Sequence, residues 1–191
     1  MEQLISEYIK RMHTALELPA MKEVPKLAAA MQLAWKNKKT IYLCGNGGSA
    51  GNANHLANDF LYGAGVKNGI GLRIDSLSAN PAVITCLAND VGYEHIFSEQ
   101  LAVLANEGDL LVALSGSGNS PNILRVLAQS KAMGVKSYAI LGYSGGKAKE
   151  VADVAIRLFD LCGGMNIDLE KHIELKMKYN SLRGYKHGKA F

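Results

Sequence analysis

The sequence has few cysteines, and their spacing excludes several classes of protein. Cys44, Cys86 and Cys162 are far apart, odd in number and form no Cys-x-x-Cys pair. This usage indicates a reducing compartment and argues against a disulfide framework or a structural zinc knuckle. The first residues include acids and no apolar segment of signal-peptide length, and no run approaches a membrane span. We therefore expect a cytoplasmic protein with no membrane partner.

An excess of positive charge is also missing from most of the chain. The formal net charge is +4, but residues 171–191 carry six Lys and Arg against one Glu, a net +5, and residues 1–170 carry a net −1. The body of the chain is therefore no basic nucleic-acid binder, and we expect no nucleic-acid partner. The basic end is interpreted as a solvated helix face and chain end, with contact to RNA, DNA or an acidic partner as the alternative.

The apolar residues form runs that predict an open parallel α/β fold. Five short runs, at residues 40–44, 70–74, 110–114, 136–141 and 153–158, are typical of buried strands and alternate with helical patterns. Such a sheet binds ligands at the carboxyl ends of its strands. Two amphipathic segments, 2–17 and 21–36, predict a helical hairpin before the first strand. We expect one domain, with N-terminal helices over 1–39, an α/β core over 40–158 and a C-terminal helix and basic tail over 159–191.

The loop after the third predicted strand has the composition of an anion-binding turn. Residues 115–120 contain only Ser, Gly and Asn, and Pro121 then stands where the first turn of a helix tolerates it. Free N–H groups at a helix start and small hydroxyls suit a single phosphate ester. No Lys follows the glycines, which excludes the nucleotide-triphosphate loop. The alternative is a βα turn that Ser120 caps and that binds nothing.

A second glycine-rich turn follows the first predicted strand. Residues 45–49 (GNGGS) lead into a helix from about residue 50 to 61, but their spacing does not match the dinucleotide-binding fingerprint. On that helix His55 and Asp59 are four residues apart and share a face. Such a pair suits a divalent metal or acid–base work, with a local hydrogen bond as the alternative. Asn89 and Asp90 are predicted in a loop, where they hold sugar hydroxyls or form an Asx turn.

Five ordered motifs give the sequence a family resemblance. They are residues 44–49 (CGNGGS), His55 with Asp59, residues 89–92 (NDVG), residues 114–120 (LSGSGNS) and residues 142–146 (GYSGG). Over about residues 20–158 the chain resembles the sugar isomerase (SIS) domain family, in its phosphoheptose isomerase branch. The resemblance implies a three-layer, flavodoxin-like sandwich with a five-stranded parallel sheet. It also implies a homotetramer with active sites shared between subunits.

The resemblance implies roles for individual residues. Ser115, Ser117 and Ser120 would hold the phosphate and Gly116 would allow close backbone approach. Further residues would line the sugar, namely Asn46, Gly47, Gly48, Asn89 and Asp90. His55 would be a zinc ligand where the family carries metal. Asp59 stands where many members have Glu, as metal ligand and catalytic carboxylate.

The last helix departs from the family pattern. The family has Gln or Glu there with a His eight residues on, and residues 158–191 contain no such pair; His172 is the only substitute. The implied activity is isomerisation of sedoheptulose 7-phosphate to glycero-manno-heptose 7-phosphate through an enediolate, for bacterial surface glycans. The alternatives are a catalytically silent sugar-phosphate-binding regulator, of the replication-initiator-associating type, and an isomerase of another phosphosugar.

Overall fold

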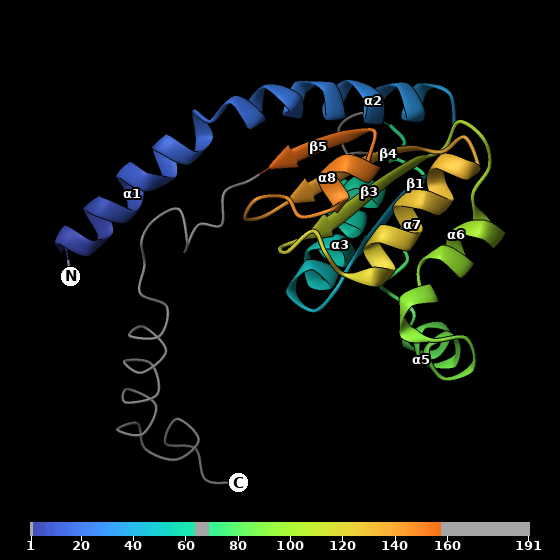
Figure 1. Cartoon of the computed structure of the whole chain (residues 1–191). Coiled ribbons are helices and arrows are strands. Elements are labelled where there is room, and N and C mark those ends of the chain that lie inside the picture. Colours follow the sequence, from blue (N-terminus) through green and yellow to red (C-terminus); the bar gives the residue numbers. More distant parts are fainter. Residues whose placement is uncertain (1, 64–68, 158–191) are drawn as a thin grey trace, which may run out of the picture.

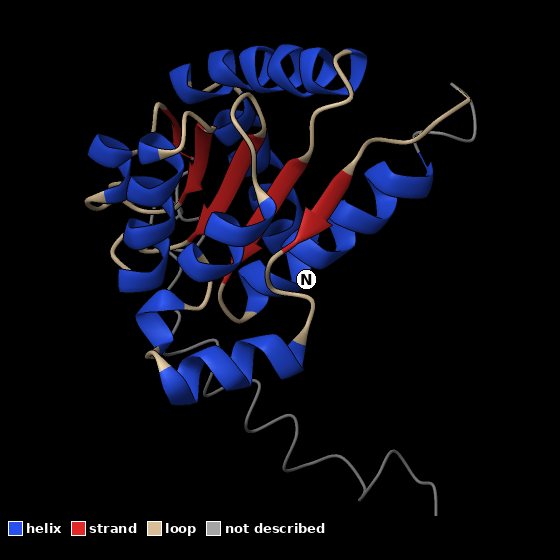
Figure 2. Cartoon of the chain, turned by 90° about the vertical axis from the view of Figure 1, so that its right-hand side faces the viewer, coloured by secondary structure: helices blue, strands red, loops and turns tan. Residues whose placement is uncertain are grey.

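A five-stranded, entirely parallel sheet lies between two layers of helices (Figures 1 and 2). The computed structural model describes residues 2–63 and 69–157. The strand order is β2-β1-β3-β4-β5. The strands are β1 (Ile41–Gly45), β2 (Ile74–Ser76), β3 (Leu110–Ser115), β4 (Lys136–Leu141) and β5 (Val154–Arg157). This order is that of a flavodoxin-like sandwich, so the predicted fold class is confirmed.

Helices cover both faces of the sheet and pack against it through two separate cores. One face is covered by α2 (Val24–Lys36) and α3 (Gly48–Asn58). The other is covered by α5 (Pro81–Asp90), α6 (Ser98–Leu104), α7 (Pro121–Ala132) and α8 (Ala148–Val151). Shorter turns are η1 (Pro19–Glu23), the π turn η2 (Asp59–Gly63) and η3 (Tyr93–His95). Among the helices of the described residues, none combines the length and apolar character that a membrane crossing requires.

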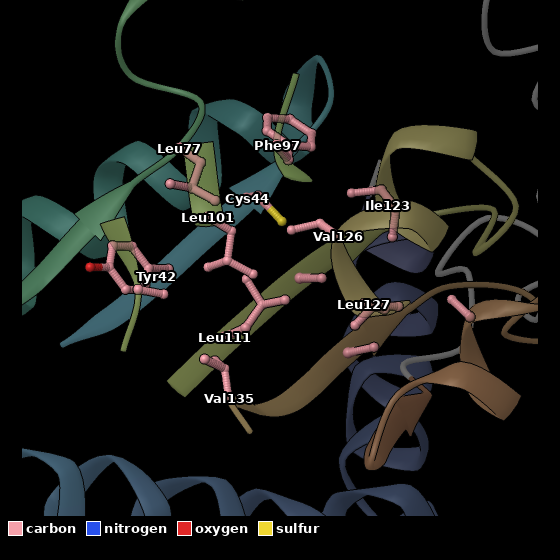
Figure 3. Close-up of a cluster of buried hydrophobic side chains, with 14 of the residues drawn as sticks. Tyr42, Cys44, Leu77, Phe97, Leu101, Leu111, Ile123, Val126, Leu127 and Val135 are labelled. Carbon is pink, nitrogen blue, oxygen red and sulfur yellow. The ribbon is translucent and has the colours of Figure 1, made fainter. Parts of the chain in front are cut away.

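The strands are apolar on both sides because each side faces helices. In β1, Ile41 and Leu43 join the core under α2 and α3, whereas Tyr42 and Cys44 join the core under α5–α8. This alternation follows from the two-residue period of a strand. Figure 3 shows the second core, where Cys44 lies near side chains of α6 and α7. Full burial raises the pKa of the Cys44 thiol to about 12, so the thiol is held neutral and inert.

The chain changes direction across the sheet between β1 and β3. It passes from β1 to β2 on one side, and then returns to β3 on the other side of β1. The helices that follow β1 and β3 therefore cover opposite faces, α3 one and α7 the other. A crevice lies at the carboxyl ends of these two strands, lined by Asn46 after β1 and by the first turn of α7, which is the usual ligand position in such sheets.

The predicted N-terminal hairpin is wrong, although its two helices exist. Helix α1 (Glu2–Leu16) and helix α2 follow one another without folding back, and α1 leads away from the sheet (Figure 1). The linker explains this difference. Glu23 and Val24 both have right-handed helical backbone angles, so η1 continues into α2 with no reversal of direction.

The second strand begins later than predicted. Residues 70–74 were expected to pair, but β2 covers Ile74–Ser76 and the pairing with β1 begins only where Arg73 O accepts Ile41 N, at 2.8 Å. The preceding segment packs instead on η2, where Leu72 N donates to Phe60 O at 3.0 Å. At Gly71 a Cβ would lie 1.7 Å from Leu61 O, so only glycine allows this approach.

Candidate functional site

Three loops come together at the carboxyl edge of the sheet. In the parallel register Gly45 pairs with Leu114, and Ser115 pairs with Leu141. The residues that follow these pairs therefore begin adjacent loops, at 46–48, 116–120 and 142–147. A hollow of about 940 Å³ lies away from these loops, between α5 and α6, and its lining is mainly apolar. We place the candidate site at the loops because they carry the polar groups that fix a ligand.

Internal hydrogen bonds shape the loop of residues 115–120, which we call the phosphate loop. Ser115 Oγ accepts from Gly118 N at 3.1 Å, and Ser117 Oγ accepts from Asn119 N at 3.2 Å. Each hydroxyl accepts in these bonds and keeps its own proton for donation to an anion. Ser115 is buried and Ser117 is exposed. The loop is thus held by hydrogen bonds to its own backbone, and the Ser115 and Ser117 hydroxyls can still donate to a ligand.

The start of α7 adds a favourable electrostatic field to the phosphate loop. Ser120 is the N-cap residue of this 12-residue helix, but its side chain makes no capping hydrogen bond. The alternative of a turn that only caps a helix is therefore unsupported at this hydroxyl. The positive end of the helix dipole attracts anions. A half-buried Ser120 hydroxyl beside it is available to a phosphate.

The third loop, residues 142–147, supports the phosphate loop from behind. Gly142 N donates to Ser115 O at 3.1 Å, Ala148 N donates to Gly118 O at 2.9 Å, and Lys147 N donates to Asn119 Oδ1 at 3.0 Å. Gly118 has φ +64°, and a Cβ there would lie 2.0 Å from Gly145 O. This contact requires glycine on both steric and backbone grounds.

The turn from β1 into α3, residues 45–49, lies beside the phosphate loop at the carboxyl edge of the sheet. A Cβ at Gly45 would lie 2.7 Å from the backbone of Ser49, and Gly47 has φ +53°, so the tight turn requires both glycines. The turn leaves Gly47 and Gly48 exposed and Asn46 half-buried. Of these three residues, predicted to line the sugar, Asn46 lines the crevice.

Sequence reasoning missed two side chains that hold Asn46. Asn46 and Asn122 exchange two amide hydrogen bonds, at 2.9 and 2.8 Å, and the Tyr93 hydroxyl donates to Asn46 Oδ1 at 3.1 Å. A hollow of about 410 Å³ adjoins them, lined also by Ser120 and Arg125. A signal for Asn122 existed, because it stands one helical turn before Val126 on the buried stripe of α7.

Asn89 and Asp90 were predicted in a loop, but they form the last turn of α5. Leu87 O accepts from Val91 N at 2.9 Å, so the helix continues past the expected break. Asn89 Nδ2 donates to Asp90 Oδ1 at 2.7 Å, and the Cys86 thiol donates to Asp90 Oδ2 at 3.4 Å. These bonds, first that of Asn89, hold the pKa of Asp90 below its usual value. Asp90 is thus an exposed carboxylate that stays ionised.

His55 and Asp59 lie together, as their spacing predicts. His55 Nε2 is 3.4 Å from Asp59 Oδ2, and both side chains are exposed, at 76% and 54%. At 1.5 Å of rise per residue, His55 lies about 10 Å and Asp59 about 16 Å along the helix direction from Gly48, at the start of α3. The pair therefore stands on an outer face of the domain, away from the crevice edge of its own chain.

The zinc expectation is only partly matched by these residues. A catalytic zinc ordinarily has three protein ligands, and His55 with Asp59 supplies two. Within residues 2–63 and 69–157, no group of three or more His, Cys, Asp or Glu could hold a metal. His172, the predicted further catalytic group, lies outside the described residues.

The fold is an open α/β domain with a hydroxyl-rich loop at the carboxyl edge of its sheet, where the strand order reverses. The SIS domain profile matches residues 6–142. The chain therefore belongs to the SIS domain family.

Within this family, relatives place the chain in the phosphoheptose isomerase branch. It is 42% identical over 123 residues to a phosphoheptose isomerase of a Nitratiruptor species, covering 64% of this chain and 65% of that one. It is 35% identical to that of Glaesserella parasuis, over 82% of this chain and 78% of the relative. The solved phosphoheptose isomerase of Neisseria gonorrhoeae is 28% identical, with a TM-score of 0.75 and coverage of 93% and 92%. The match to the Nitratiruptor relative thus spans just under two thirds of that protein's length.

Proposed function

We propose that the protein is a phosphoheptose isomerase that interconverts sedoheptulose 7-phosphate and glycero-manno-heptose 7-phosphate. The observation that carries the proposal is the phosphate loop, which carries three serine hydroxyls between the end of β3 and the N-cap of α7 and leads into Asn122, the hydrogen-bond partner of Asn46. The names of the relatives support the same activity. A cytoplasmic location belongs to the proposal because the substrate is a phosphorylated metabolite.

Binding of the substrate divides between two loops. The hydroxyls of Ser115, Ser117 and Ser120 hold the phosphate, helped by the helix dipole and by the backbone of Gly116. Asn46 and its neighbouring glycines hold hydroxyls of the sugar chain. Because the phosphate is fixed, the C1 and C2 atoms at the other end of the sugar are held at a set distance from the loop. Binding therefore also orients the atoms that react.

The reaction moves one proton between adjacent carbons. A base removes a proton from C1 of the ketose, and the electron pair of that C–H bond forms the enediolate as the charge passes to O2. Return of a proton to C2, with transfer of the O1 proton to O2, gives the aldose. We propose Asp59 as the base and His55 as the acid that stabilises the enediolate oxygen. His172 is proposed as a further catalytic group.

The position of this pair supports a shared site in a homotetramer. His55 and Asp59 stand about 10–16 Å along α3 from the crevice edge, on an exposed face. We propose that they act on the sugar held by the loops of a second copy. If a zinc ion participates, it would polarise the substrate's oxygens. His55 and Asp59 then supply two of its ligands and the remainder comes from outside the described residues of one chain.

Incubation of the purified protein with sedoheptulose 7-phosphate, followed by NMR in deuterated water, tests the proposal. We expect formation of the aldose, with solvent deuterium at C2. The assay is run with added zinc and with a chelator, and against pentose and hexose phosphates. Turnover of only another sugar phosphate would reassign the substrate. Tight binding without turnover of any would instead identify a sugar-phosphate-binding protein.

A further inference from the structure

The Asn46 side chain is held by three hydrogen bonds from two distant parts of the chain. Asn46 Nδ2 donates to Asn122 Oδ1 at 2.9 Å, and Asn122 Nδ2 donates to Asn46 Oδ1 at 2.8 Å. The Tyr93 hydroxyl is a third partner, 3.1 Å from Asn46 Oδ1. All three distances are those of well-formed hydrogen bonds. The orientation of the Asn46 amide is therefore set before any ligand arrives.

The burial of Asn122 shows that this contact is built into the fold. Asn122 is 1% exposed, whereas Asn46 is half-buried and Tyr93 is 55% exposed. A buried amide must find hydrogen-bond partners within the protein, and the Asn122 amide finds them in Asn46. The pair thus joins the end of β1 to the first turn of α7, across 76 residues of sequence.

Asn122 also belongs to the structure that carries the phosphate loop. It is the second residue of α7, two positions after Ser120 at the N-cap. Ser120 is thus two residues from Asn122, and two hydrogen bonds join the Asn122 amide to the Asn46 amide. This path connects the Ser120 hydroxyl, which we propose binds phosphate, with the Asn46 side chain, which we propose binds the sugar. The two loops are therefore linked by side chains as well as by the sheet.

We propose that Asn122 and Tyr93 are positioning residues that fix the Asn46 amide relative to the phosphate loop. This inference rests on the proposed function, since it assumes that one ligand spans both loops. One Nδ2 proton of Asn46 bonds Asn122, and the other is directed by that bond toward the ligand. The adjoining hollow of about 410 Å³, lined by Asn46, Tyr93, Ser120 and Arg125, gives the sugar chain access to this amide.

The proposal separates two affinities that a purely structural role would change together. Inorganic phosphate needs only the phosphate loop, whereas sedoheptulose 7-phosphate also needs the Asn46 amide. In Asn122→Ala we expect the affinity for inorganic phosphate to stay within about twofold and the affinity for the sugar phosphate to fall about tenfold, the loss of one oriented hydrogen bond. Isothermal titration calorimetry measures both.

Two further variants keep the test independent of folding. Tyr93→Phe removes only one hydroxyl from an exposed residue, and we expect its sugar-phosphate affinity to fall about threefold with phosphate affinity unchanged. Ser130→Ala is the matched control, because Ser130 is buried on the same side of α7 but its hydroxyl donates to Leu127 O, at 2.8 Å. We expect that variant to change neither affinity.

The outcomes distinguish this proposal from the proposed function. A parallel loss of both affinities in Asn122→Ala, or an unchanged sugar-phosphate affinity in Tyr93→Phe, overturns the positioning role. A wild-type protein that binds the sugar phosphate no more tightly than inorganic phosphate overturns it as well. If the wild type binds the sugar phosphate more tightly but does not isomerise it, the proposed activity fails and the affinity comparison still decides the role of Asn122.

Discussion

The phosphate loop and the His55–Asp59 face differ in how completely one chain builds them. Hydrogen bonds within the phosphate loop and from residues 142–147 hold that loop in place, and glycines allow the close contacts. His55 and Asp59 are exposed, and one contact at 3.4 Å joins them. Asn58 Nδ2 also donates to Asp59 Oδ1, at a long 3.5 Å, and an exposed pair of this kind contributes little to stability. The comparison teaches that one chain preorganises the phosphate loop through its own hydrogen bonds, whereas it leaves the His55–Asp59 pair on an exposed face.

The largest effect is expected from Asp59→Asn, which leaves binding intact and removes the proposed base. We expect kcat to fall by about 10²–10⁴-fold, the usual contribution of a positioned acid or base. The Kd for inorganic phosphate should not change. Steady-state kinetics and calorimetry measure the two quantities. The matched control is Glu7→Gln, another exposed carboxylate with a basic partner four residues away on a helix. A full kcat in Asp59→Asn would remove Asp59 from the mechanism.

Gly118→Ala tests the other region by breaking the contact between two loops. Its φ of +64° and the 2.0 Å approach of a Cβ to Gly145 O require the loop to move. We expect phosphate affinity to fall about 100-fold, because small misplacements of binding groups have effects of this size. Strain of this kind also costs about 2 kcal/mol of unfolding free energy.

Gly116→Ala is the control for that substitution. A Cβ at Gly116 meets no atom within 4 Å, and the glycine is exposed. Its unfolding free energy should stay within about 0.5 kcal/mol of the wild type in chemical denaturation. Equal destabilisation of the two variants would contradict the assignment of residues 142–147 as the support of the phosphate loop.

Ser120→Ala sharpens the distinction between a ligand-binding serine and a capping serine. The Ser120 side chain makes no capping bond, so we expect about tenfold weaker phosphate binding and an unfolding free energy within about 0.5 kcal/mol of the wild type. Asn80→Ala should do the reverse. Asn80 Oδ1 caps α5 by accepting from Ala82 N and Val83 N. Its loss costs about 1 kcal/mol and should leave phosphate binding unchanged.

The sequence predicts the sheet because its strands are apolar on both faces and end in glycine-rich loops. The expected positions of β1, β3, β4 and β5 agree with the structure to within a residue or so at each end. The edge strand β2 could not be placed from its sequence. Leu72 is bonded to Phe60, a contact between distant segments that no local pattern contains. The passage from α1 to α2 without a reversal of direction likewise depends on backbone angles at the linker.

The parts of the candidate site that a local sequence pattern encodes could be predicted. Small hydroxyls and glycines in a βα turn indicate an anion site, and His55 with Asp59 are neighbours by helical periodicity alone. Asn122 and Tyr93 were missed because their role lies in bonds to Asn46, which is 76 and 47 residues away. Asn89 and Asp90 were misplaced because polar residues at a helix end resemble a turn.

The smallest effect is expected at Asp90, and it tests whether this carboxylate acts as a constant charge. Hydrogen bonds from Asn89 and Cys86 lower the pKa of Asp90 from 3.8, so any stability that it contributes is present above that value and lost as the pH falls through the lowered pKa. Cys86→Ala removes one donor and should raise the pKa of Asp90 back toward 3.8, measured by NMR titration of its carboxyl carbon. Because both values lie well below neutrality, stability and sugar-phosphate affinity between pH 5 and 8 should be the same in variant and wild type. If the sugar-phosphate affinity instead depended on pH in that range, and Cys86→Ala shifted this dependence, Asp90 would exchange a proton during binding. Asp90 would then act as an acid or base and not as a constant charge.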